Sequence, residues 1–240
     1  MTIRNLQASN KAATAEQRMR TWALGLEVQD RVEREKAVAK LPDKIHPYLA
    51  ISREAGAGGS DIAYRVGELL QWEVLDKELL DYMAERYQVP HELLKSVDES
   101  TWNWFHEVFG KWLERNVVTQ SEYVAHLGPV VLMAAQHGSC VFVGRGVQFI
   151  LPRARGLTVR IVAPQEYRIR RIIEQQKMNH AEAAKYIAST DKGRYDFVHT
   201  YYRQDISDSH QYDLVVNMEH FSASDAAELI ADQCRRRFGP

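Results

Sequence analysis

Short apolar runs that alternate with longer helical patterns constrain this chain more than any other feature of its sequence. The runs typical of strands are residues 48–52, 73–76, 140–144, 157–163 and 212–218. Segments such as VFV and LVV are continuously apolar, which is typical of strands buried on both faces. Because helical patterns separate the runs, the sequence predicts an α/β fold with a parallel sheet covered by helices.

The helical patterns also suggest how the chain is divided. We expect helices over 60–70 and 77–87, one that ends at Gly138, and one that begins after Ser222. Residues 1–45 differ, because a polar tail is followed by a capping-box pattern at Thr14 and Gln17. The apolar positions after it, such as Trp22, are sparse. The sequence therefore predicts an exposed or partner-facing helical extension over 1–45, followed by one domain over 46–240.

Composition excludes several classes of protein. Hydrophobic residues make up 45% of the 240 residues, and the formal net charge of −1 provides no field for general nucleic-acid binding. Cys140 and Cys234 are the two cysteines, so a disulfide framework is not expected. The sequence shows no signal-peptide core and no stretch long enough to span a bilayer. We expect a cytoplasmic protein without nucleic-acid or membrane partners.

The stretch ISREAGAGGS follows the first apolar run and precedes a helical pattern. Glycines in such a loop let consecutive backbone N–H groups point into one concavity, and the helix N-terminus adds positive potential. This arrangement favours phosphate binding, although a tight strand-to-helix turn is the alternative. When the motif GxxxxGK[ST] is aligned on Ser60, Arg53 takes the first glycine position and Gly59 takes the lysine position. The Ser60 hydroxyl could cap the helix or hold Mg²⁺.

The segment SREAGAGGSDIAYRVGELLQWEVLDKELL resembles the opening of the cytidylate kinase-like family, within the P-loop nucleoside monophosphate kinases. VFVGRGVQFI, QEYRIRRIIEQQ and STDKGRYDF resemble later segments of that family in the same order, over about residues 46–235. The family often has a glycine pair where the motif's lysine would stand. The resemblance implies a P-loop kinase-like parallel sheet flanked by helices, with helical acceptor and lid insertions, and ATP and Mg²⁺ as ligands.

The resemblance also implies roles for single residues. Asp76 and Arg145 would face the acceptor, although Asp76 also fits a helix N-cap and Arg145 a surface loop. Val143 stands where the family has an acidic residue, so a metal-binding carboxylate is missing there. The ATP phosphates would bind Gly56, Ala57, Gly58, Gly59 and Ser60, with Ser60 on the metal. The cations around the migrating phosphoryl group would be Arg168, Arg171 and Arg194. Apart from the resemblance, the place of Arg53 at the head of the loop suggests that it replaces the missing lysine.

These features predict ATP-dependent phosphoryl transfer to a nucleoside monophosphate, with cytidylate as the family's named substrate, or to a similar small acceptor. One alternative is a kinase for a non-nucleotide small molecule, because the aromatic segment 101–116 does not match a cytosine pocket. Another is a nucleotide-binding regulatory protein with little or no turnover, because the lysine and the acidic residue are both absent. The aromatic residues also fit a core or an oligomer face, so a homo-oligomer is a further expectation.

Overall fold

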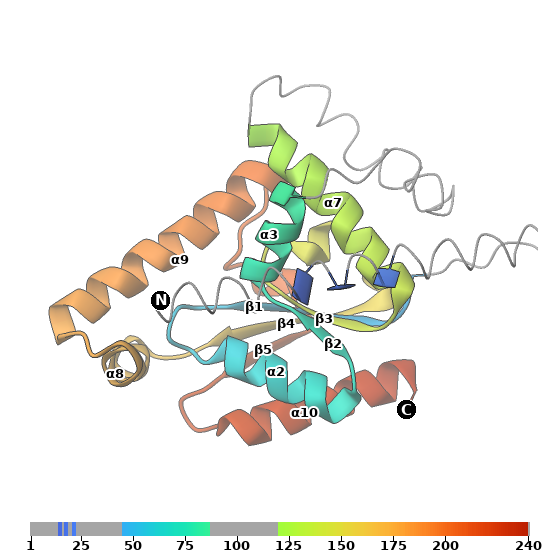
Figure 1. Ribbon diagram of the computed structural model, residues 1–240. Helices are drawn as coiled ribbons and strands as arrows, with labels where there is room; N and C mark the ends of the chain where they lie inside the picture. Colours follow the sequence, from blue (N-terminus) through green and yellow to red (C-terminus); the bar gives the residue numbers. More distant parts are fainter. Residues whose placement is uncertain (1–13, 16, 19–20, 23–44, 87–119, 240) are drawn as a thin grey trace, which may run out of the picture. The chain divides into compact units, whose positions relative to one another are not determined.

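The computed structural model describes residues 14–15, 17–18, 21–22, 45–86 and 120–239 (Figure 1). The chain forms two compact units. The first combines Met1–His46 with Lys77–Ser139, and the second combines Pro47–Asp76 with Cys140–Pro240. The second unit contains the sheet and the glycine loop. The predicted boundary at residue 45 stays a prediction.

The second unit is built on five parallel strands in the order β2-β3-β1-β4-β5. This confirms the α/β fold with a parallel sheet, and each strand begins and ends within two residues of its predicted run. The side-by-side register sets Ser52 opposite Arg160 and Ile51 opposite Val143. The strands are β1 (Tyr48–Arg53), β2 (Glu73–Leu75), β3 (Cys140–Val143), β4 (Gly156–Val162) and β5 (Leu214–Asn217).

Helices α2 (Gly59–Leu70) and α10 (Ala223–Phe238) pack side by side on one face of this sheet (Figure 1). Helix α10 begins as predicted, because the Ser222 hydroxyl accepts the Asp225 N–H in a capping box. The helix-favouring stretch between β4 and β5 forms two helices, α8 (Gln165–Gln176) and α9 (His180–Tyr202). Short 3-10 helices cover Val147–Phe149, Arg153–Arg155 and Ser209–Gln211.

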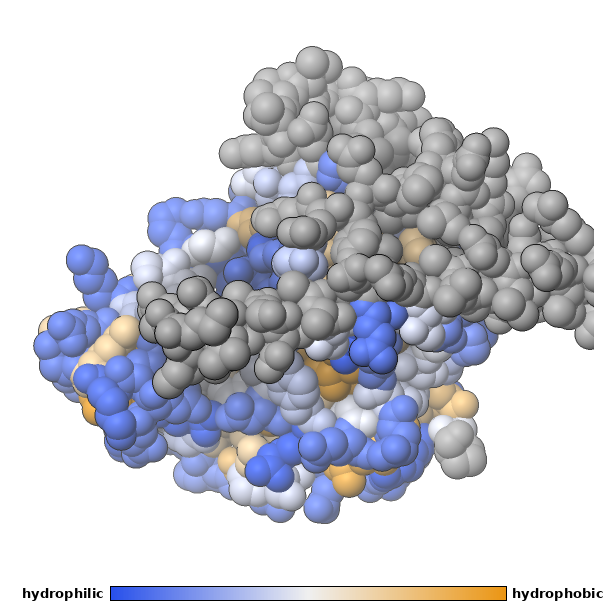
Figure 2. All heavy atoms as spheres, viewed as in Figure 1, coloured by the Kyte–Doolittle hydropathy of each residue, from blue (hydrophilic) through white to orange (hydrophobic). Residues whose placement is uncertain are grey.

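The core of the second unit lies between the sheet and the pair α2 and α10. Leu49 and Ile51 of β1, Ile62 and Val66 of α2, and Ile230 of α10 belong to one buried cluster. Figure 2 shows a mostly hydrophilic described surface on the side in view, with small and separate hydrophobic areas. Burial of these apolar side chains, which is the main favourable contribution to folding, therefore fixes the sheet and the two helices as a scaffold for the loop between them.

The first unit contains α3 (Lys77–Arg86) and α7 (Gln120–His137), which pack against each other. The Trp22 side chain is buried, and its ring centroid lies 6.2 Å from that of His137. The expectation of an exposed N-terminal segment is therefore wrong at Trp22, because one large ring buries enough apolar area without a periodic stripe. The rest of the predicted extension and the aromatic segment 101–116 lie outside the described residues. Within the described ranges, no helix has the length and hydropathy required to cross a membrane.

Candidate functional site

The loop Glu54–Gly58 connects the carboxyl end of β1 to α2. Gly56 and Gly58 have φ angles of 79° and 87°, in the left-handed region that favours glycine. Gly56 is also close to α8, since a Cβ built on it would lie 2.7 Å from the carbonyl oxygen of Arg168. Gly58 occupies the N-cap position of α2 and supplies no capping side chain. The expectation that Ser60 caps the helix is therefore wrong, because Ser60 is already the second residue of α2.

A hollow of about 160 Å³ lies against this loop and the start of α2. The first N–H groups of a helix have no partner within the helix, so an uncapped N-terminus offers donors and positive potential to an anion. Gly59 is buried at its base, and the exposed Ser60 lies beside it. The hollow is lined by Arg53, Glu54, Ala55, Gly56, Gly58, Gly59, Ser60, Asp61, Arg171, Ile172, Gln175, Gln176, Tyr186 and Arg194.

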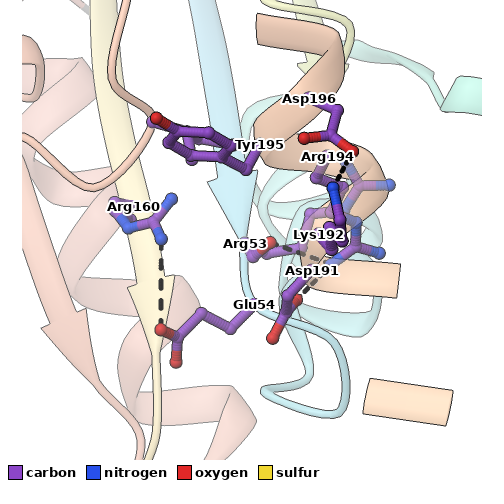
Figure 3. A pocket seen from close by; sticks show the side chains of 9 residues that line it. Arg53, Glu54, Arg160, Asp191, Lys192, Arg194, Tyr195 and Asp196 are labelled. Carbon is purple, nitrogen blue, oxygen red and sulfur yellow. Dashed lines mark hydrogen bonds and ion pairs between the residues drawn. The ribbon is translucent and has the colours of Figure 1, made fainter. Parts of the chain in front are cut away.

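A second hollow, of about 390 Å³, is drawn in Figure 3. The two hollows share Arg53, Glu54 and Arg194, which therefore form a common wall. The lining of the larger hollow contains four cationic and three acidic side chains, so this hollow suits a ligand with both anionic and hydroxyl groups. The lining residues are Arg53, Glu54, Arg160, Asp191, Lys192, Arg194, Tyr195, Asp196 and Ile206.

Helix α9 is attached to the loop by two residues that lie three positions apart. The Asp191 carboxylate accepts the Ala55 N–H at 2.7 Å and a hydrogen bond from Arg168 Nη1 at 2.5 Å. Arg194 Nη1 donates to the carbonyl oxygen of Arg53 at 2.9 Å. These charge-assisted bonds fix α9 over the carboxyl end of β1.

Helix α8 is attached through its predicted arginines. Arg168 Nε donates to the Ala163 carbonyl at 3.0 Å and lies 3.5 Å from the Glu54 carboxylate. Arg171 Nη2 lies 2.6 Å from Asp61 Oδ2 at the start of α2. The two arginines share a helix face as expected, but their surroundings differ. Arg171 lines the smaller hollow, whereas Arg168 lines neither hollow and bonds to the structure around the loop.

Arg160 was missed by the sequence analysis. It is 8% exposed, its Nη1 donates to the Ser52 hydroxyl at 3.1 Å, and its guanidinium lies 5.7 Å from the centre of the Tyr212 ring. Nη2 is 3.9 Å from Glu54, at the edge of the larger hollow (Figure 3). The available signal was a charged residue inside the otherwise apolar run LTVRIVA, since buried charges in strands need partners.

Asp76 and Arg145 lie elsewhere in the second unit. Asp76 follows β2 and accepts a hydrogen bond from the Tyr64 hydroxyl at 2.8 Å. The Arg145 guanidinium lies 4.7 Å from the centre of the Phe197 ring, and its carbonyl accepts the Tyr202 hydroxyl at 2.7 Å. Neither Asp76 nor Arg145 lines either hollow, so these two are not brought together with the loop.

The oxygen donors near the loop fit a metal ion that arrives with a ligand. Ser60 contributes an exposed hydroxyl, and Val143 provides no carboxylate at the end of β3. Across 45–86, 120–239 and the few described N-terminal positions, no group of three or more His, Cys, Asp or Glu residues could hold a metal. Mg²⁺ commonly binds through few protein ligands together with substrate phosphates. A resident metal held by side chains alone does not fit this donor set.

A profile of the cytidylate kinase-like family matches residues 48–220. The chain belongs to the cytidylate kinase-like family. This confirms the predicted family, and membership suggests phosphoryl transfer as the class of activity and nucleotide binding as its requirement. A comparison with curated proteins found no match.

Several solved structures resemble this member of the cytidylate kinase-like family. An uncharacterized protein from Eubacterium ventriosum shares 21% identity with a TM-score of 0.64, covering 80% of this chain and 99% of that chain. Shikimate kinase from Acinetobacter baumannii, in complex with shikimate, shares 17% identity with a TM-score of 0.42, covering 79% and 93%. A gluconokinase from Sinorhizobium meliloti shares 10% identity with a TM-score of 0.43, covering 81% and 95%. Because the protein from Eubacterium ventriosum shares only 21% identity with this chain, its similarity concerns the fold alone.

Proposed function

We propose that this protein transfers a phosphoryl group from ATP to a nucleoside monophosphate, with cytidylate as the first acceptor to test. The observation that carries the proposal is the wall of Arg53, Glu54 and Arg194 shared by the two hollows. Phosphoryl transfer requires a donor and an acceptor that meet in a place lined by cations, and little covalent chemistry from the protein. A site with two adjacent chambers and arginines between them meets this requirement.

The smaller hollow is the proposed place for the ATP phosphates. Backbone N–H groups at the start of α2 would donate to phosphate oxygens, and Arg171 would add a cation at the rim. Ser60 would hold Mg²⁺ together with the phosphates, and the ion would neutralise part of their charge. Ala57 does not line the hollow, so we propose that it supports the turn through its N–H, which donates to the Glu54 carbonyl at 3.2 Å.

The larger hollow is the proposed place for the acceptor. Arg160 and Lys192 would attract its phosphate, and the carboxylates of Asp191 and Asp196 would accept hydrogen bonds from ribose hydroxyls. Tyr195 is 40% exposed and offers a ring face to a base. The roles of Asp76 and Arg145 at the acceptor stay predictions that rest on the family resemblance.

The arginines would act in two ways. Arg194, which lines both hollows, would stabilise the charge that develops on the migrating group. Arg168 would act as a positioning residue, because its guanidinium already contacts the Ala163 carbonyl, Glu54 and Asp191. Preorganised donors of this type need no reorientation during the reaction.

A nucleotide-binding protein without turnover is the second candidate. Asp191 accepts the Ala55 N–H, so one donor of the loop is engaged by the chain's own carboxylate. Val143 also leaves the end of β3 without a carboxylate. In this case ATP would bind and no acceptor would be phosphorylated. A kinase for a non-nucleotide small molecule remains the third alternative, since no described residue identifies a cytosine-specific contact.

The test measures ATP binding by calorimetry and then ADP release with each common nucleoside monophosphate, followed by a panel of polyols and hydroxy acids. We expect ADP release to be stimulated most by cytidylate, and Arg170→Ala, which removes an exposed arginine of α8 outside both hollows, to behave as wild type. ATP binding without stimulation by any acceptor would favour the second candidate. Stimulation by a non-nucleotide alone would reject the nucleoside monophosphate.

A further inference from the structure

The side chain of Arg53 passes between two glycines that come from different elements. A Cβ built on Gly59, the first residue of α2, would lie 2.6 Å from the Arg53 Cβ and 2.9 Å from its Cγ. A Cβ built on Gly144, directly after β3, would overlap Nη1 of Arg53 and lie 3.2 Å from its Cζ. Real Cβ atoms essentially never come closer than 3.0 Å to non-bonded heavy atoms beyond their own and the adjacent residues. We call the space between these glycines the Arg53 slot.

The slot explains the unusual register of the loop. In the motif GxxxxGK[ST] a glycine stands first and a lysine stands sixth after it, and the lysine reaches the β- and γ-phosphates. In this chain the arginine stands at position 53 and the glycine at position 59, so the cation and the glycine are exchanged. The stems of side chains at 53 and 59 would occupy the same space, so both positions cannot carry a long side chain together.

We infer that Arg53 supplies the phosphate-contacting cation that the lysine supplies in that motif. Gly59 and Gly144 make this possible, because neither carries a side chain that would occupy the space of Arg53. The inference rests on the proposed function. Arg53 lines both hollows, and its guanidinium lies at the Gly144 end of the slot, so Arg53 borders the place where donor and acceptor would meet. A guanidinium presents several N–H donors in one plane and can bind two phosphate oxygens at once.

If the cation and the glycine are exchanged, two substitutions that each weaken phosphate binding should restore it when they are combined. An arginine with a merely structural role would not produce this result. Arg53→Gly should weaken the binding of ATP and of inorganic triphosphate by about 10- to 100-fold, the range for a lost charge-assisted hydrogen bond. Gly59→Lys alone should also weaken binding, because the new stem collides with Arg53. Arg53→Gly combined with Gly59→Lys should regain most of the lost affinity, because the lysine then has the slot to itself.

A variant with methionine at position 59 distinguishes the effect of the positive charge from the effect of filling the slot. Arg53→Gly with Gly59→Met relieves the collision and fills the slot without charge, so it should bind triphosphate as weakly as Arg53→Gly. If the methionine variant regains as much affinity as the lysine variant, the inference is overturned. Arg53→Lys and Arg53→Met give the same comparison without touching Gly59. Here lysine should bind about 10-fold more tightly than methionine, and equal binding would count against the inference.

Calorimetry with inorganic triphosphate and ATP measures these affinities, and thermal unfolding checks that each variant folds. Arg170→Ala is the charge control and should bind both as wild type does. If the variants show the expected triphosphate affinities but the wild-type protein transfers phosphate to no acceptor, the proposed function is rejected and the inference stands. If the wild-type protein transfers phosphate but its triphosphate affinity does not change when Arg53 is substituted, the inference is rejected and the proposed function stands. A wild type that binds neither ATP nor triphosphate would overturn both.

Discussion

The two ends of the same parallel sheet both carry charged side chains, but they use them in different ways. At the amino end, the Asp213 carboxylate accepts the Thr158 N–H at 2.7 Å and the Thr158 hydroxyl at 2.9 Å, and it pairs with Arg153 at 3.3 Å. The Tyr48 ring fills the space above Gly156, where a Cβ would overlap it. At the carboxyl end, carboxylates and arginines surround hollows of about 160 and 390 Å³.

This difference separates charged side chains that stabilise the fold from charged side chains that border a space where a ligand can bind. Asp213 bonds to Thr158 and Arg153, and the Tyr48 ring fills the space over Gly156. Asp191 and Arg194 also bond within the protein, but their side chains border open space. In sheets of this type, ligands bind at the carboxyl ends of the strands. Changes at the amino end should therefore affect stability, and changes at the carboxyl end should affect binding and transfer.

The largest effect is expected at the amino end, from Tyr48→Ala. Tyr48 is fully buried, and its hydroxyl lies 3.3 Å from the carbonyl oxygens of Leu151 and Pro152. Truncating a buried aromatic ring costs about 3–5 kcal/mol of unfolding free energy, and Tyr48→Phe should cost about 1 kcal/mol. Urea unfolding measures both costs. ATP affinity, measured by calorimetry where each variant is folded, should stay at the wild-type value. A parallel fall in affinity would break the distinction between the two ends.

Arg194→Ala should show the opposite profile at the carboxyl end. Arg194 lines both hollows, and its loss should lower the rate of phosphoryl transfer by about 100-fold, as expected for a removed transition-state donor. The unfolding free energy should fall by only about 1 kcal/mol, because the lost contacts include a hydrogen bond to the Arg53 carbonyl and a 3.8 Å ion pair with Asp191 at a partly exposed position. Turnover at saturating substrate and urea unfolding give the two numbers, with Arg170→Ala as control. A variant that loses stability but keeps its turnover would assign Arg194 to the fold.

A smaller effect is expected from alkaline pH, which compares the buried Tyr48 near the amino end with the half-buried Tyr202 near the carboxyl end. Burial raises the pKa of Tyr48 and of Tyr202 well above the ordinary value near 10, and raises the pKa of the Cys234 thiol to about 12. The folded protein keeps these protons while the unfolded chain loses them. The contribution of these three groups to stability is therefore constant below about pH 8.5 and falls as pH rises further, by up to about 1.4 kcal/mol per pH unit for each group.

Unfolding free energies between pH 8 and pH 11 test this dependence. Tyr48→Phe and Tyr202→Phe should each reduce the slope above pH 10 by a similar amount, since each substitution removes one phenol that is deprotonated only in the unfolded chain. If only one variant reduces the slope, the other phenol is more accessible to water in solution than its burial indicates.

Much of the fold could be predicted from the sequence, because continuous apolar runs indicate strands buried on both faces. The order β2-β3-β1-β4-β5 could not, since the runs do not encode which parallel strands become neighbours. The break between α8 and α9 had a local signal. Asn179 caps α9 in a capping box with Glu182, and Lys177 adopts a left-handed φ of 57°. That signal lay within a long helix-favouring stretch and was not separated from it.

The loop glycines were predicted from the strand-loop-helix pattern, Arg53 from its place at the head of the loop, and Arg171 and Arg194 from the family resemblance. All of them line the smaller hollow, while their roles stay predictions. Arg160 was missed because its role depends on strand register, which sets it beside Ser52. Glu54 was missed for a similar reason, since its carboxylate accepts the Ala163 N–H of the next strand's loop at 3.1 Å. Contacts between strands are tertiary, and residue spacing does not reveal them.

The smallest effect tests whether α9 needs to bend. Gly193 lies in α9 between Asp191 and Arg194, is exposed, and a Cβ built on it would meet nothing within 4 Å. Gly193→Ala should therefore raise the unfolding free energy by about 0.5–1 kcal/mol, because alanine loses less backbone entropy in a helix. Thermal unfolding measures the gain, and turnover should stay at the wild-type value if α9 moves as a rigid helix. A gain in stability with a loss of turnover would mean that α9 flexes at Gly193 during the reaction. The carboxyl end would then differ from the amino end in its motion as well as in its open space.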